Sequence, residues 1–145
     1  MSLLAALASI GVASATSPVP FTMADEVSVS AVSTFTSTGP LCASGTFVDD
    51  VALLAIARSA QARSGRGSVL IRSVYTCDDG SGTFVMVKHL TLTFTDTGFA
   101  DTGPVEILGG TGAYAGVTGH GSTSGGTNAR SGLGGGTTTG LVQLG

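Results

Sequence analysis

Apolar and polar side chains alternate over residues 83–95, and this long alternation limits the possible folds more than any other feature of the sequence. Its length is that of a long β-strand in a small domain. Successive side chains of a β-strand point to opposite faces, so every second residue of this segment shares a face. That face carries Phe84, Met86, Lys88, Leu90, Leu92 and Phe94. The pattern predicts a long strand with one mostly apolar face turned toward a core.

Shorter runs of the same kind occur along most of the chain, separated by glycine-containing turns. Asp78-Asp79-Gly80-Ser81-Gly82 is such a turn, and it predicts a hairpin over 68–95. Further strands are expected at 27–36, 44–50, 68–76, 103–108, 115–123 and 137–144, the last two rich in glycine and threonine.

Two segments interrupt this series. Residues 51–58 fit either a buried strand or two turns of helix, because a short apolar run does not distinguish the two. Residues 124–136 contain six glycines, which favours a mobile loop. The chain therefore offers seven strands, or eight if 51–58 is extended.

These strands predict a single all-β domain over 27–145, because no helical repeat is long enough for βαβ units. Charged residues make up only 10% of the chain. A closed sheet has no exposed edge for charges to protect. The first choice is accordingly a small antiparallel β-barrel of about eight strands, and the alternative is a β-sandwich.

Lys88 is the anomaly of the longest strand, because alternation places it among apolar side chains. Buried lysines are rare unless they are paired, since loss of solvent disfavours the charge. Glu106 or Asp101 would serve as a partner. The alternative is a bulge or an extended side chain that returns Lys88 to the solvent.

The N-terminal residues are typical of an export signal. Residues 1–15 contain an apolar run too short to span a bilayer, followed by Ala13-Ser14-Ala15, a pattern that signal peptidase accepts. We expect a signal peptide over 1–15, a mature protein that starts near Thr16 and is secreted, and a linker over 16–26. Beyond the signal, no segment is expected to enter a membrane. An even number of cysteines in an exported chain then predicts a disulfide between Cys42 and Cys77.

Several functional classes receive no support from the sequence. Six Lys and Arg in total and a net charge of −3 argue against a nucleic-acid partner. The acidic pairs lack calcium-loop spacing, and neither His89 nor His120 stands in a metal or catalytic motif. The glycines at 109–112 match a loose dinucleotide fingerprint, but more glycines follow where a helix would have to begin. We expect no metal and no cofactor.

Two stretches resemble known families. Residues 77–84 (CDDGSGTF) and 109–121 (GGTGAYAGVTGHG) are similar to a group of small secreted actinobacterial proteins, over roughly 40–121 of this chain. The second stretch also resembles the G-G-T-G-x-[FY] segment of plant dirigent proteins and, more loosely, allene oxide cyclase. The resemblance implies an eight-stranded antiparallel barrel with an apolar lumen. It transfers no catalytic residue, because none of those families' catalytic residues has a match here.

The sequence therefore leads to an expectation of a barrel that binds a small, mostly apolar molecule in its lumen. The alternatives are a structural or interaction barrel with a filled core, and an isomerase or cyclase of the allene oxide cyclase type. Whether the protein is an enzyme, and its oligomeric state, stay open. The candidate lumen residues are Phe84, Met86, Lys88, Leu90, Leu92, Phe94 and Glu106.

Overall fold

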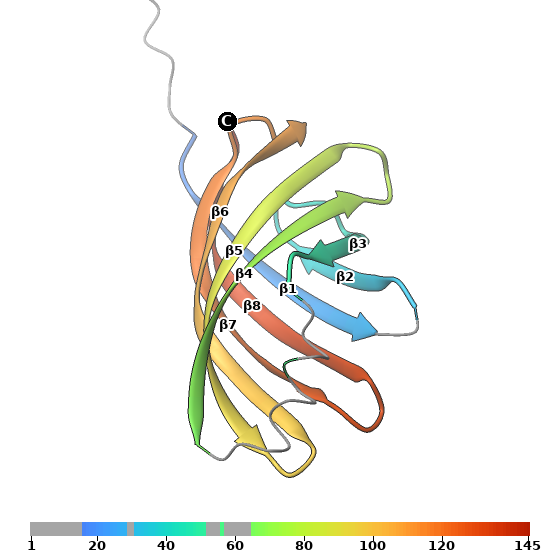
Figure 1. Ribbon diagram of the computed structural model, residues 1–145. Helices are drawn as coiled ribbons and strands as arrows, with labels where there is room; N and C mark the ends of the chain where they lie inside the picture. Colours follow the sequence, from blue (N-terminus) through green and yellow to red (C-terminus); the bar gives the residue numbers. More distant parts are fainter. Residues whose placement is uncertain (1–15, 29–30, 52–55, 57–64) are drawn as a thin grey trace, which may run out of the picture.

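The protein is a closed antiparallel β-barrel of eight strands, each paired with its neighbours in the sequence (Figure 1). A computed structural model of the chain describes residues 16–28, 31–51, 56 and 65–145. Strand β8 pairs with β1 from Val19↔Val142 to Ser28↔Leu133, and this pairing closes the sheet. The all-β barrel expected from the sequence is thus confirmed. The strands are β1 (Val19–Ser28), β2 (Ser33–Thr38), β3 (Ser44–Asp49), β4 (Arg66–Cys77), β5 (Gly82–Thr95), β6 (Gly98–Gly112), β7 (Thr118–Asn128) and β8 (Leu133–Gln143).

The first strand lies where a linker is expected from the sequence, so the linker over 16–26 is wrong from Val19 onward. Phe21, Met23 and Asp25 are buried, and the residues between them are exposed. Pro20 obscures this alternation, but proline is compatible with the first residues of a strand. The expected signal peptide over 1–15 lies outside the described residues.

The single strand expected over 27–36 is wrong, because β1 ends at Ser28 and a second strand, β2, begins at Ser33. The hairpin pairs Glu26 with Thr34 and Asp25 with Phe35. Since the numbers of each pair share the same parity, odd positions point inward on both strands. The inward positions of the two strands therefore share one period in the sequence, which explains why 27–36 has the pattern of a single strand.

The loop expected over 124–136 is also wrong, because this segment holds the hairpin of β7 and β8. Gly125 pairs with Gly136, and Gly126 pairs with Gly135. A Cβ atom on Gly125 would lie 2.1 Å from the carbonyl oxygen of Gly135. Glycine is needed here for close approach of two backbones, not for flexibility. Most of 51–58, open between strand and helix, lies outside the described residues.

Apolar side chains fill the barrel in two separate clusters. The larger contains the rings of Phe35, Tyr75 and Phe84, with ring centroids 4.9–5.9 Å apart. The smaller contains Ile71 and Leu90. Aromatic packing of this density makes one end of the lumen a solid core.

The disulfide between Cys42 and Cys77 is confirmed, with the two Cα atoms 5.9 Å apart. Both cysteines are buried in the larger cluster. Cys77 ends β4, and Cys42 lies in the connection between β2 and β3. The bond therefore fixes a connection to the wall of the barrel.

Candidate functional site

A polar layer separates the two apolar clusters inside the barrel. On β4 and β5 the inward positions between the clusters are Ser73 and Lys88, and Asp25 of β1 reaches the same place beside Lys88. On β7 and β8, buried Thr123 and Thr138 continue the layer, and the Thr138 hydroxyl donates a hydrogen bond to Thr123 over 2.9 Å. Buried polar groups on five strands thus meet at one level of the lumen.

The centre of the layer is an ion pair between Lys88 and Asp25. Lys88 Nζ lies 2.8 Å from Asp25 Oδ2, and the two residues are only 8% exposed. The Tyr75 hydroxyl donates to the same oxygen over 2.8 Å. Lys88 therefore points into the lumen. The ion-pair partner expected from the sequence, Glu106 or Asp101, is wrong, because Asp25 of β1 makes this contact.

The environment of the Tyr75 hydroxyl keeps this donor protonated. Burial, followed by the negative charge of Asp25, raises the pKa of Tyr75 well above its ordinary value of 10.0. Lys88 Nζ lies 5.3 Å from the ring centroid of Phe47 and 5.4 Å from that of Tyr75, where aromatic faces favour a cation.

Two further carboxyl groups face the ion pair, so acidic groups outnumber basic ones. Asp49 accepts a hydrogen bond from the Ser73 hydroxyl over 2.5 Å. Burial raises the pKa of Asp49 above its ordinary range, although the Ser73 hydrogen bond and Lys88 oppose the shift. Burial likewise raises the pKa of Asp101 against the opposing charge of Lys88. The single ammonium group does not fully compensate three carboxyl groups.

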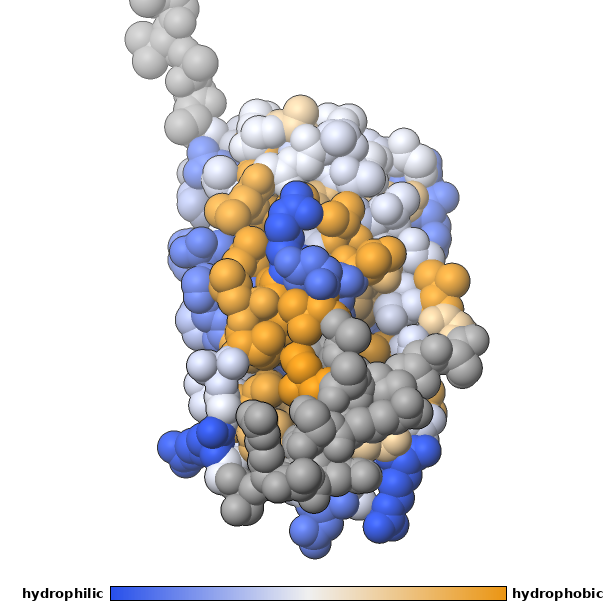
Figure 2. Space-filling view, viewed as in Figure 1, coloured by the Kyte–Doolittle hydropathy of each residue, from blue (hydrophilic) through white to orange (hydrophobic). Residues whose placement is uncertain are grey.

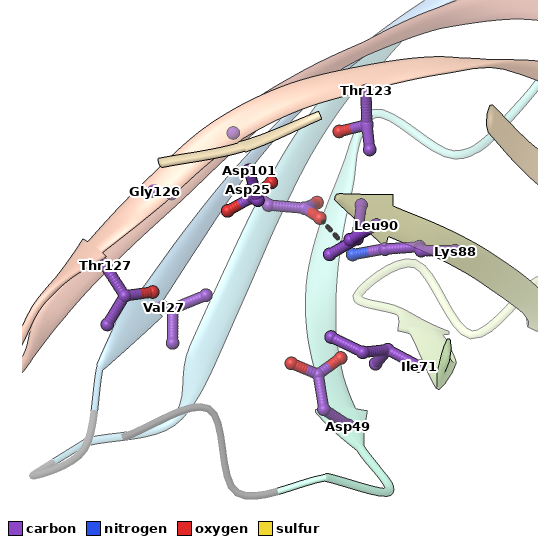
Figure 3. A pocket seen from close by; sticks show the side chains of 12 residues that line it. Asp25, Val27, Asp49, Ile71, Lys88, Leu90, Asp101, Thr123, Gly126 and Thr127 are labelled. Atoms are coloured by element: carbon purple, nitrogen blue, oxygen red, sulfur yellow. Dashed lines mark hydrogen bonds and ion pairs between the residues drawn. The ribbon is translucent and has the colours of Figure 1, made fainter. Parts of the chain in front are cut away.

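These groups surround a partly open cavity of about 30 Å³. Figure 3 shows Lys88 reaching Asp25 across it, with Asp49 and Ile71 on another side. The second oxygen of the central carboxyl group, Asp25 Oδ1, is buried and has no hydrogen-bond partner among the described residues. The space accommodates one or two water-sized groups, since one such group needs roughly 10–15 Å³. A carboxylate oxygen beside such a space is a site for a hydrogen-bond donor.

Most of the residues expected in the lumen are indeed in the interior. Phe84, Met86, Lys88, Leu90 and Leu92 are buried, and Phe94 is partly buried against the smaller cluster. Lys88 and Leu90 are the two that line the cavity.

Glu106 is the exception, because it is exposed on the outside of the barrel and its expected place in the lumen was wrong. The inward residues of β6 are its neighbours Val105 and Ile107. Asp25 and Asp49, which no motif indicates, were missed. The alternation of Phe21, Met23, Asp25 and Val27 is the signal that would have found Asp25.

The described residues hold no group of three or more His, Cys, Asp or Glu side chains arranged for a metal ion. In the same part of the chain, no helix has the length and apolar character to cross a membrane. Larger hollows of about 420 and 300 Å³ lie over β5, β6 and β7, lined mostly by threonine and glycine. They are shallow and lack the buried, unpartnered group that the lumen provides.

Replacing Asp101 by asparagine should remove part of the pH dependence of stability. A raised pKa means that the folded protein holds this proton more tightly than the unfolded chain, so ionisation of Asp101 destabilises the fold as pH rises above 3.8. Between pH 3.8 and the raised pKa, we expect the wild type to lose stability relative to Asp101→Asn as pH rises. Above the raised pKa the difference should stay level. Urea titrations between pH 3 and pH 7 measure it, and a pH-independent difference would contradict the assignment.

The fold and the site together define a closed eight-stranded antiparallel β-barrel with a buried charged pair in its lumen. Comparison of the chain with protein-family models, curated proteins and solved structures gives no match. The resemblance to actinobacterial, dirigent and allene oxide cyclase proteins therefore stays a prediction.

Proposed function

We propose that the barrel binds a small molecule through a cationic, hydrogen-bond-donating group such as a primary ammonium. The observation that carries this proposal is the buried, unpartnered oxygen Asp25 Oδ1 beside the lumen cavity. An ammonium group has three donors, and its charge would compensate the excess of carboxyl groups around the cavity.

The size of the cavity limits how much of a ligand the lumen can enclose. A site for a whole drug-sized molecule offers about 300 Å³ or more. The lumen cavity measures about 30 Å³, so it holds a head group while the rest of the ligand extends toward the mouth. Apolar side chains at this level, Val27, Ile71 and Leu90, would contact a short alkyl chain. An apolar molecule enclosed in the lumen is not supported by this volume.

A filled, structural barrel is the second candidate, and the aromatic packing of the larger cluster favours it. In that case the polar layer would hold one or two ordered waters and no ligand. No particular observation favours an isomerase or cyclase, which stays a prediction. The confirmed disulfide supports the proposal that the protein works after export, because such bonds persist in oxidising compartments.

Binding of n-butylamine and n-butanol, followed by NMR at pH 7, tests this proposal. We expect saturable shifts at cavity residues for the amine, with an affinity near the millimolar range, since a ligand of this size contributes little contact. The alcohol should bind at least tenfold more weakly. Asp101→Asn should weaken amine binding. The control Glu26→Gln removes an exposed carboxyl group next to Asp25 in sequence and should leave binding unchanged. Equal binding of amine and alcohol, or shifts confined to the outer surface, would refute the proposal.

A further inference from the structure

The outer face of β4, β5 and β6 carries an apolar patch that the lumen site does not use. Figure 2 shows hydrophobic atoms gathered over β4 and β5 on the face toward the viewer. Leu70 and Leu108 are 57% and 58% exposed, and Val48 on β3, beside Val74, is 70% exposed. Contiguous apolar surface of this kind marks an interaction site more often than scattered residues do.

Two opposite charges stand symmetrically about the middle of this patch. Arg72 on β4 pairs in register with Val87 on β5, and Val87 pairs with Glu106 on β6. Arg72 and Glu106 are exposed and lie about 10 Å apart, two strand spacings. Among the described residues neither side chain has an ion-pair partner. These three residues, which lie side by side on β4, β5 and β6, form a row with a positive, an apolar and a negative side chain.

The rows on either side are apolar at both ends. Toward the disulfide, Val74 is in register with Val85, and Leu108 lies opposite Val85 at the bulge between β5 and β6. Toward the other end, Leu70 is in register with His89, and Pro104 occupies the outward position of β6 next to it. If a second copy is placed on this face with its β6 opposite β4 and its β4 opposite β6, apolar residues face apolar residues. Each positive side chain then faces a negative one.

We propose that two copies of this chain associate through this face, about a two-fold axis that runs along β5 in the plane of contact. The axis would place Arg72 of each copy against Glu106 of the other, with Val87 at the centre. The contact is isologous, since one patch complements itself. A two-fold axis across the strands would instead oppose like charges, so the charges select the first arrangement.

The size of the patch limits its affinity. About three outward residues on each of three strands is fewer than the 20–30 residues per partner of a standard interface. We therefore expect a transient dimer with a dissociation constant in the micromolar range or weaker. Its formation is independent of the lumen site.

Sedimentation velocity between 10 µM and 1 mM tests the proposal. Arg72→Glu alone and Glu106→Arg alone should each weaken association at least tenfold, because each homodimer then opposes like charges twice. A mixture of the two variants should associate as wild type does, since both contacts between unlike copies pair opposite charges. Asp101→Asn, inside the lumen, serves as the control and should dimerise normally. A wild-type monomer at 1 mM, or a mixture of variants that stays monomeric, would overturn the proposal.

Discussion

Replacing Lys88 by methionine is expected to lower the free energy of unfolding by about 3–5 kcal/mol. The substitution removes the ammonium group that lies 2.8 Å from Asp25 Oδ2 and leaves a carboxylate buried with Tyr75 as its one remaining donor. Removing one member of a buried pair costs far more than the pair contributes, because the remaining charge is uncompensated. Urea unfolding followed by circular dichroism measures the loss.

The double variant Asp25→Asn/Lys88→Met supplies the control. An asparagine still accepts a hydrogen bond from Tyr75 but carries no charge, so the double variant should be more stable than Lys88→Met alone. Arg130→Met, which removes an exposed positive charge, should change stability by less than about 0.5 kcal/mol. If Lys88→Met were as mild as Arg130→Met, the side chain would not be buried beside Asp25.

Removing the disulfide should have an effect of similar size. The bond joins residues separated by 35 positions, and a closed loop of this length stabilises the fold by about 4 kcal/mol in the chain-entropy description. Cys42→Ala/Cys77→Ala should therefore lower the melting temperature by roughly 10 °C or more in a domain of this size.

A nearby surface substitution separates this effect from general disturbance of the same region. The hydroxyl of Ser44 donates a hydrogen bond to Asp78 at the surface, in the same part of the barrel as the disulfide. Ser44→Ala should cost less than about 1 kcal/mol. A melting temperature of the cysteine double variant within two or three degrees of wild type would show that the bond does not constrain the unfolded chain.

The fold class could be predicted from the sequence because alternation is a local signal. The pattern around Phe84, Met86 and Leu90 depends only on the two-residue period of a strand, and the structure confirms that these residues are buried. The inward position of Lys88 follows from the same period. The same period shows that Glu106 should not have been expected in the lumen. Glu106 lies between Val105 and Ile107, which are the inward residues of β6, so its side chain points outward.

The partner of Lys88 could not be predicted in this way. Asp25 lies 63 residues earlier in the chain and reaches Lys88 across the lumen. That proximity depends on closure of the barrel through β1 and β8, which is a property of the whole sheet. The glycine pairs of β7 and β8 were missed for a related reason. The sequence does not distinguish a glycine that allows a neighbouring backbone to approach closely from a glycine that makes a loop flexible.

The most direct test of the proposed ammonium site is a crystal structure of the protein with 4-iodobenzylamine, compared with crystals soaked in 4-iodobenzyl alcohol. Anomalous scattering locates the iodine independently of the rest of the density. We predict an iodine peak beside the cavity near Val27 and Leu90, with the amine nitrogen within hydrogen-bond distance of Asp25 Oδ1. The alcohol should give no peak there. Water alone in the cavity of the amine-soaked crystal, or the same iodine position with both compounds, would contradict the proposed site.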